Sequence, residues 1–371
     1  MPQHLYVHVP FCPSICPFCD FHVLERRAGL VDAYLAAVER DAARLADRFG
    51  PLALETIYLG GGTPSYLREG ELDRLVAIIR RSVGWAGTEA TLEIHPSTVG
   101  AARLSQWADL GFTRLSLGVE STNDSVLQFL GRSHDAATAL RALDALVADG
   151  RFAVSADVMT AIPGQDVAAD LHTVAKAGPS HVSAYTLTIE PGTPFARAGV
   201  TVDAKAELAA LHTASEVLGS YGLVRYEVSN HARPGNESRH NQAYWRSRYW
   251  LGLGPSAAAF EPPGPQDPAG TIAVRSTSQG FEQWVADADP ERETLDATDF
   301  LTTAVLAGLR LLREGADLGA ISAVAGLNAQ AVLADRVEGL VAAGLLDRVE
   351  NHVRATAAGI VVLDQVAEAL L

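Results

Sequence analysis

Short apolar runs alternate with amphipathic stretches along most of the chain. Runs typical of β-strands cover residues 5–9, 55–59, 90–95, 114–119, 154–159, 181–187 and 224–228. Apolar residues recur at helical spacing over residues 30–48, 70–81, 136–148, 167–177 and 205–221. Such alternation is typical of an α/β fold with a parallel sheet, and the six to seven units found here are fewer than a full eight-fold barrel needs. The pattern therefore predicts a partial barrel.

The last quarter of the chain has a different pattern. Residues 258–279 are rich in proline and glycine and predict a loop that serves as a boundary or a lid. Helical stretches over 300–312, 318–325 and 329–343 follow, and Gly344 then predicts a helix stop. Strand-like pieces at 346–349 and 352–355 complete a small helical, winged-helix-like module. The predicted domains are a barrel over 1–257, a linker over 258–293 and a C-terminal domain over 294–371.

Composition and charge limit the partners of this chain. It has 371 residues, of which 48% are hydrophobic, which is ample for a buried core. The net charge of −15, with no offsetting basic run, argues against a protein that wraps nucleic acid. No apolar run approaches the length of a membrane span, and the first residues do not resemble a signal peptide. We therefore expect a cytoplasmic protein.

All three cysteines lie within one octet, as Cys12, Cys16 and Cys19. Such clustering predicts three thiolates that converge on one metal site, because an odd number of cysteines cannot form a disulfide framework. Closed zinc sites and cubane iron–sulfur clusters normally take four protein ligands. Three cysteines would leave one iron of a cubane cluster open to a substrate or a cofactor.

Unusual residues recur where the predicted strands end, which is the end that carries the active site in barrels of this type. Gly60, Gly61 and Gly62 lack Cβ atoms, so their backbone can approach a ligand closely. Glu93 and Asp157 lie in otherwise apolar strands, where a bare carboxylate is costly. A bound cation, or a partner such as Arg132, would offset that cost.

A further element, His240-Asn241-Gln-Ala-Tyr244-Trp245, has two readings. Taken alone, it fits an ordinary turn in the core. It also fits a haem site, because a histidine can ligate haem iron while aromatic rings cover the macrocycle. The residue pattern alone leaves both open.

Together these motifs resemble the HemN-like branch of the radical S-adenosylmethionine (SAM) superfamily. In chain order the resemblance rests on Tyr6, Cys12-x3-Cys16-x2-Cys19-Asp-Phe21, Gly60-Gly-Gly-Thr-Pro64, Glu93-x-His-Pro, Ser116-Leu-Gly-Val-Glu120, Gly131-Arg132-x-His134, Asp157-x-Met159 and Ile189-Glu-Pro-Gly-Thr-Pro194. It implies a partial (β/α)6 barrel and a [4Fe-4S] cluster on the three cysteines. The positions it implies for SAM contacts are Tyr6, Gly61, Gly62, Thr63, Glu93, Glu120, Arg132 and Asp157.

The His240-Asn241-x-x-Tyr244-Trp245 element is similar to the haem-binding motif of the haem-chaperone group, HemW, within this branch. That similarity implies haem as a ligand and acceptor haemoproteins as partners. It also allows transfer of haem at the membrane surface, and a homodimer is a further expectation. Two departures from the oxygen-independent coproporphyrinogen oxidases favour this group: Phe21 stands where they have a fourth cysteine, and only eleven residues precede Cys12. Glu120 and His95 replace the Gln and Asn that are usual in the family.

Three functions remain at this point. The leading one is a haem chaperone that retains a radical SAM cluster and passes haem to haemoproteins. The second is a radical SAM enzyme, either a coproporphyrinogen III dehydrogenase or a C-methyltransferase, and the resemblance leaves open whether a substrate is turned over. The third, an electron-transfer protein, is disfavoured because three cysteines leave the cluster open.

Overall fold

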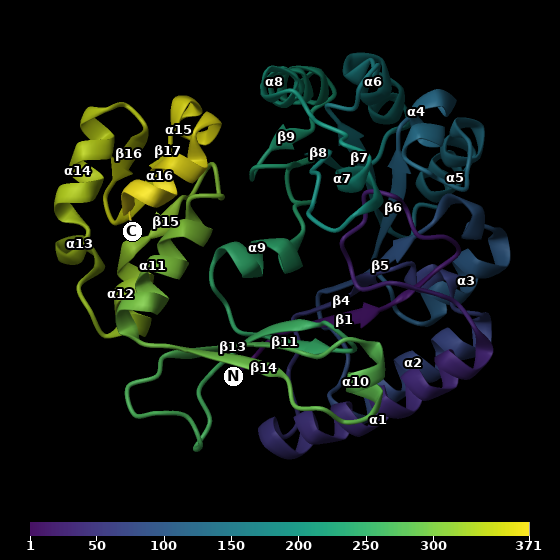
Figure 1. Cartoon of the computed structure of the whole chain (residues 1–371), viewed down its shortest axis with the longest axis horizontal. Coiled ribbons are helices and arrows are strands. Elements are labelled where there is room, and N and C mark those ends of the chain that lie inside the picture. Colours follow the sequence, from purple (N-terminus) through teal and green to yellow (C-terminus); the bar gives the residue numbers. More distant parts are fainter. Residues whose placement is uncertain (371) are drawn as a thin grey trace.

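The computed structural model describes residues 1–370 and shows a partial barrel followed by a C-terminal helical domain (Figure 1). Residue 371, the last of the predicted C-terminal domain, lies outside the described residues. Six parallel strands follow one another across the sheet. They are β1 (His4–Val9), β4 (Thr56–Gly61), β5 (Glu89–Ile94), β6 (Arg114–Glu120), β7 (Ala153–Thr160) and β8 (His181–Thr186).

Helices cover the outer face of these strands (Figure 1). They are α1 (Ala28–Phe49), α2 (Glu69–Ser82), α3 (Ala101–Asp109), α4 (Asp124–Phe129), α5 (Ala136–Asp149), α6 (Val167–Ala177) and α8 (Ala204–Ser220). Asp135 and Asp166 cap α5 and α6 by accepting backbone N–H bonds, and both helices end at a left-handed glycine. One continuous apolar core joins the helices to the strands and includes the fully buried Trp107.

Four strands extend the sheet beyond β1. The strand β11 (Trp250–Leu253) pairs parallel to β1, and β12 (Ala258–Glu261), β13 (Ala273–Thr277) and β14 (Glu291–Leu295) continue it in antiparallel fashion. The prediction of a loop over 258–279 is therefore wrong at both ends, where β12 and β13 form strands. It is right only between these strands, where the prolines lie. The short helix α10 (Phe281–Val285) also lies in the predicted linker.

The seventh predicted strand, 224–228, is shorter than expected and does not pair with β8. It is β9 (Val224–Arg225), which pairs antiparallel with β10 (Asn230–Ala232), and β10 in turn pairs antiparallel with β8. Because both pairings are antiparallel, β9 runs in the same direction as β8 but is separated from it by β10. The remaining short elements are β2 (Phe11–Cys12), β3 (Leu24–Glu25), α7 (Pro194–Arg197), α9 (Arg239–Trp245) and two single-turn helices, Pro64–Tyr66 and Pro96–Thr98.

The C-terminal domain packs around a second core that contains Phe300 and Leu340. Its elements are α11 (Ala297–Gly308), β15 (Ala316–Asp317), α12 (Leu318–Ala325), α13 (Ala329–Val332), α14 (Ala334–Ala342), β16 (Leu346–Val349), β17 (His352–Ala355), α15 (Ala357–Val361) and α16 (Leu363–Leu370). The helix predicted over 329–343 is divided at the buried Leu333.

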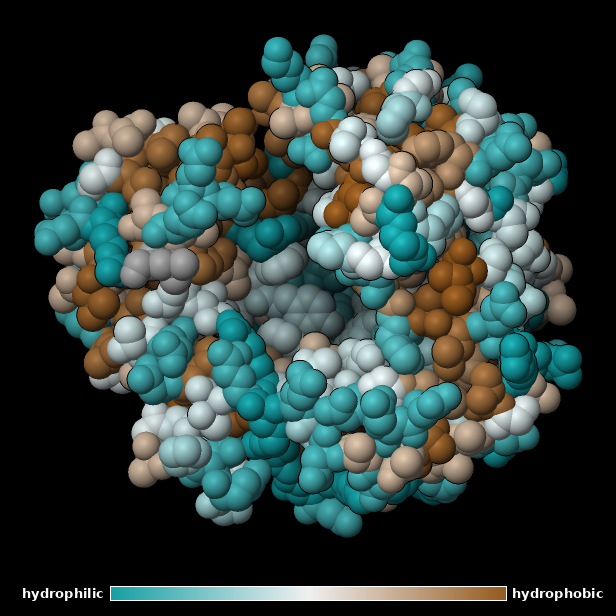
Figure 2. All heavy atoms as spheres, viewed as in Figure 1, coloured by the Kyte–Doolittle hydropathy of each residue, from teal (hydrophilic) through white to brown (hydrophobic). Residues whose placement is uncertain are grey.

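The face drawn in Figure 2 is hollowed at its centre, between the C-terminal domain and the barrel. In the same view, α9 lies between these two parts (Figure 1). Within residues 1–370 no helix has both the length and the hydropathy that a membrane crossing requires.

Candidate functional site

A cavity of about 190 Å³ lies at the carboxyl ends of the barrel strands and is lined by all three cysteines. It gathers residues from the Cys loop, the glycine loop and the ends of β5, β6 and β7. Of the sequence-predicted site residues, its lining contains Cys12, Cys16, Cys19, Gly61, Gly62, Thr63, Glu93, Glu120, Arg132 and Asp157. The structure therefore brings ten separately predicted positions to one place.

The Cys loop leaves β1 and is fastened to the barrel by polar contacts. Thr63 donates a hydrogen bond from Oγ1 to the sulfur of Cys12 (3.6 Å), and Arg132 donates one from Nη1 to the sulfur of Cys16 (3.6 Å). Burial raises the pKa of the Cys12 thiol to about 11 and also raises that of Cys19. No group of three His, Cys, Asp or Glu side chains within 1–370 is already arranged as metal ligands.

The glycine loop packs against the start of the Cys loop, and its close approach explains two of its glycines. Gly61, the last residue of β4, has φ +102°, a conformation that favours glycine, and the loop begins directly after it. A Cβ on Gly62 would stand 2.8 Å from the backbone oxygen of Val9. Gly62 N–H donates to that oxygen (2.9 Å), so the two loops are joined through their backbones.

Glu93 on β5 is held at the floor of the cavity by two donors. Tyr58 donates its hydroxyl to Oε1 (2.7 Å), and the Gly61 backbone N–H donates to Oε2 (3.0 Å). Burial nevertheless raises the pKa of Glu93 to about 7. The nearby Asp157 carboxylate raises it further, because two like charges repel each other. A cationic ligand in the cavity would stabilise the ionised form.

Asp157 and Glu120 form the acidic side of the same cavity. Ser116 donates to Oδ2 of Asp157 (2.9 Å), and burial raises the pKa of Asp157 to about 6. Glu120 has φ +64° at an irregularity in the pairing of β6 with β7, a strained conformation for a residue other than glycine. Tyr185 donates to Oε2 of Glu120 (2.7 Å), and Arg132 lies 3.6 Å from Oε1.

A second cavity, of about 470 Å³, lies between the barrel edge and α11 of the C-terminal domain. Tyr6, which the resemblance places among the SAM contacts, lines this cavity and does not line the one with the cysteines. Its lining is Tyr6, Tyr244, Trp245, Ser247, Trp250, Ala258, Phe260, Arg275, Thr303 and Ala307. Two of the four predicted haem residues, Tyr244 and Trp245, thus face one largely aromatic space.

The other two predicted haem residues lie outside this lining. Asn241 is half-buried on α9 and its backbone N–H donates to the Ser238 capping hydroxyl. His240 is fully buried, with 0% of its surface exposed. Its Nδ1 is hydrogen-bonded to Thr56 Oγ1 (2.7 Å) and its Nε2 to the Tyr244 hydroxyl (2.7 Å). Direct iron ligation by His240 therefore does not fit this structure, because both ring nitrogens already have partners in the core.

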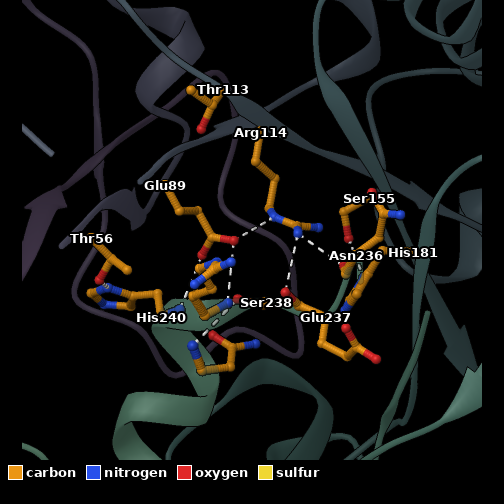
Figure 3. Close-up of polar contacts among 12 residues, drawn as sticks. Thr56, Glu89, Thr113, Arg114, Ser155, His181, Asn236, Glu237, Ser238 and His240 are labelled. Carbon is orange, nitrogen blue, oxygen red and sulfur yellow. Dashed lines mark hydrogen bonds and ion pairs between the residues drawn. The ribbon is translucent and has the colours of Figure 1, made fainter. Parts of the chain in front are cut away.

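A buried ion pair holds the start of α9 against the barrel (Figure 3). Arg114 donates from Nε to Glu89 Oε2 (3.0 Å) and from Nη2 to the backbone oxygen of Asn236 (2.9 Å). Glu89 also accepts the backbone N–H of His240 (3.0 Å). Sequence reasoning missed this pair, although two charged residues at the starts of apolar strands were a visible signal.

Sequence reasoning also missed the partners of the predicted carboxylates. Tyr58 and Tyr185 are strand residues whose hydroxyls donate to Glu93 and Glu120. Tyrosines in strands are common in any sheet, so nothing in the sequence singled out these two.

Two buried histidines meet beside the cavity. Nε2 of His95 lies 3.3 Å from Nδ1 of His134, and burial lowers the pKa of His95 to about 3 and that of His134 to about 4.

Comparison with known proteins assigns the chain to a family. The family model described as the radical SAM superfamily matches residues 6–176, and that of the HemN C-terminal domain matches residues 295–362. A protein named heme chaperone HemW from Mycobacterium tuberculosis is 33% identical over 100% of this chain and 95% of its own length. The chain belongs to the HemW family.

Two other relatives agree with this HemW assignment. The heme chaperone HemW of Escherichia coli is 34% identical over 68% of this chain and 68% of its own length, and that of Synechocystis is 35% identical over 70% and 66%. Among solved structures, the coproporphyrinogen III oxidase HemN of Escherichia coli has a TM-score of 0.81 and 22% identity, covering 100% of this chain and 90% of its own. That likeness shows a shared fold, a partial barrel with a C-terminal helical domain.

Membership of the radical SAM superfamily implies a [4Fe-4S] cluster and SAM as cofactors of this HemW-family chain. The residues present fit both groups. Three free thiols line one cavity beside a glycine loop whose backbone approaches closely. Burial raises the pKa of Glu93 and of Asp157 in the same cavity, and a cationic ligand there would stabilise their ionised forms.

Proposed function

We propose that this protein is a haem chaperone: it binds haem in the aromatic cavity and passes it to acceptor haemoproteins. The observation that carries the proposal is the aromatic cavity itself, which is separate from the cavity that holds the cysteines.

The walls of the aromatic cavity suit a flat, apolar macrocycle. Trp250 and Phe260 stack with centroids 5.1 Å apart, and Tyr244 meets Trp250 edge-on at 4.6 Å. Arg275 is the one charged residue in the lining. Its guanidinium donates to Glu293 (3.1 Å) and to Thr303 Oγ1 (2.7 Å), and a haem propionate would replace one of these partners. A volume of about 470 Å³ is in the usual range for a small-molecule site.

The space beside the cluster loop argues against porphyrinogen oxidation. A cavity of about 440 Å³ there is lined by Asp20, Glu93, Asp157 and Glu190, with no Lys, Arg or His in its lining. Coproporphyrinogen carries four propionate groups, and this lining offers no cation to pair with them. The charge pattern therefore favours a chaperone over a coproporphyrinogen dehydrogenase.

Cys12, Cys16 and Cys19 are proposed to hold the cluster, because they share one cavity. For SAM, the proposed contacts in that cavity are Gly61, Gly62, Thr63, Glu93, Glu120, Arg132 and Asp157. A cluster held by these three cysteines would leave one iron free to bind the amino and carboxylate groups of SAM. Tyr6 is reassigned from SAM to the aromatic cavity that it lines.

The proposal also covers the partners and the cellular compartment of the protein. Acceptor haemoproteins are the proposed partners because the relatives are named heme chaperones, and the cytoplasm is the proposed compartment. Delivery of haem at a membrane surface and a homodimer are also proposed, and both rest on the family resemblance alone.

A haem titration with a cavity-filling variant tests the proposal. Ala307 on α11 lines the aromatic cavity, so Ala307→Phe should fill it and weaken haem binding at least tenfold. Ala342→Phe is the matched control, because Ala342 is an exposed helical alanine in the same domain. Equal haem affinity in wild type and Ala307→Phe would show that haem does not bind in this cavity. Conversion of coproporphyrinogen in a parallel assay with SAM and a reductant would favour the enzyme instead.

A further inference from the structure

The end of β6 has an irregular backbone beside the cavity lined by the three cysteines, called here the cysteine cavity. Glu120, which lines that cavity, has φ +64°, a left-handed conformation that residues other than glycine rarely adopt. The pairing of β6 with β7 shifts its register between Gly118 and Glu120, and Val119 has no partner on β7. The backbone oxygen of Val119 accepts instead from the backbone N–H of Ser121, across the turn (2.8 Å).

A second donor reaches the same backbone oxygen from a different part of the chain. Nε2 of His134, a buried residue, lies 3.3 Å from the oxygen of Val119. In the same segment, 131–134, Nη2 of Arg132 lies 3.6 Å from the Glu120 carboxylate. This segment therefore holds the turn at two points, the backbone oxygen that precedes Glu120 and the side chain of Glu120 itself.

We propose that His134 is a positioning residue for SAM, because its bond to Val119 keeps Glu120 in the conformation in which the carboxylate lines the cysteine cavity. This inference rests on the proposed SAM contacts in that cavity. It gives a role to a histidine of the Gly131-Arg132-x-His134 motif that does not itself line the cavity.

The partners of two buried histidines determine where their protons lie. A carbonyl oxygen only accepts, so Nε2 of His134 carries the proton and Nδ1 is the acceptor. The Ser97 backbone N–H donates to Nδ1 of His95 (3.2 Å), so the proton of that ring lies on Nε2, which is 3.3 Å from Nδ1 of His134. The Ser133 hydroxyl, also 3.3 Å from this Nε2, shares that proton. The bonds thus run in one direction, from His95 through His134 to Val119, and they fix the orientation of the His134 ring.

Segment 131–134 also contacts the loop that carries the cysteines. Arg132 donates from Nη1 to the sulfur of Cys16 (3.6 Å), and a Cβ on Gly131 would stand 2.6 Å from Cδ of Pro17. The segment thus joins the Cys loop to the Glu120 turn, so that one short stretch of chain sets the positions of two walls of the cysteine cavity.

The test is a calorimetric titration of the anaerobically reconstituted full chain with SAM. His134→Leu removes the donor and should weaken SAM binding about fivefold, the effect of one lost hydrogen bond, while the iron content stays unchanged. His134→Gln should restore the affinity, because its amide N–H can take the place of the Nε2 donor. His181→Leu is the matched control, because His181 is a buried histidine of β8 that bonds to Ser155 and Tyr226 outside the cavity lining. It should lose stability and keep the SAM affinity of the wild type.

A double-mutant cycle tests whether His134 acts through Glu120. Glu120→Ala removes the carboxylate, and adding His134→Leu should then change the SAM affinity no further. A second loss of the same size in the double variant would overturn the inference. So would a loss in His134→Gln equal to that in His134→Leu.

A measurement on the wild type covers the case in which His134→Leu does not fold. Heteronuclear NMR of the histidine-labelled full chain at neutral pH, assigned with His134→Gln, should show His134 as the neutral Nε2–H tautomer. The Nδ1–H tautomer would overturn the inference. Equal SAM affinity in wild type and His134→Leu also overturns it and leaves the SAM site and the chaperone proposal standing. Failure of the wild type to bind SAM overturns the inference together with the SAM site.

Discussion

Replacing Arg114 with Met tests whether the buried ion pair holds α9 in place. Both side chains of the Glu89–Arg114 pair are only 6% exposed, and their closest atoms are 3.0 Å apart. The substitution leaves the Glu89 carboxylate buried without its cation and frees the backbone oxygens of Asn236 and Glu237. Breaking a buried pair from one side costs about 3–5 kcal/mol, a large part of the roughly 5–15 kcal/mol that stabilises a typical domain.

The assay is urea unfolding of wild type, Arg114→Met and the control Arg74→Met. Arg74 pairs with Asp32 at 3.1 Å on the surface, where the two side chains are 59% and 72% exposed. An exposed pair contributes only about 0–1 kcal/mol, so the control should unfold almost as the wild type does. A loss below about 1 kcal/mol in Arg114→Met, equal to the control, would refute the role given to the buried pair.

Three further results are expected. Cys16→Ala should abolish the iron content of anaerobically reconstituted protein, measured by iron and sulfide analysis, and full iron retention would contradict the cluster assignment. Gly62→Val should weaken the change that SAM causes in the EPR spectrum of the reduced cluster, because a Cβ there meets the Val9 backbone oxygen at 2.8 Å. Because the folded pKa of Glu93 is raised from 4.5 to about 7, the ligand-free protein should lose stability as pH rises through that window. Glu93→Gln should remove part of this loss in urea unfolding, and parallel pH profiles would contradict it.

The parallel strands could be predicted closely because their sequence pattern is local. The ends of β1 and β4–β8 fall within two residues of the predicted runs, since each is a short apolar segment between helical patterns. The strand β11 escaped prediction because it is defined by its pairing with β1, far away in the sequence. The pattern of 224–228 likewise does not show that β10 lies between β8 and β9 in the sheet.

The candidate site divides in the same way. Residues that are chemically unusual for their position, such as the cysteines and Asp157, could be predicted, and they line one cavity. What a motif cannot reveal is the direction in which each side chain points. His240 and Tyr244 belong to one short element, yet only Tyr244 lines the aromatic cavity and His240 is fully buried. Tyr6 was placed with SAM by resemblance, whereas its strand position turns it toward the aromatic cavity.

Haem transfer tests the chaperone proposal most directly. The protein is loaded with haemin and mixed with increasing concentrations of an apo-haemoprotein, and the transfer rate is followed by stopped-flow absorbance. A chaperone that hands over its cargo predicts a rate that rises with acceptor concentration, and Ala307→Phe should fail at the loading step while Ala342→Phe behaves as wild type. A transfer rate that is independent of acceptor concentration would mean passive release of haem and would contradict the account.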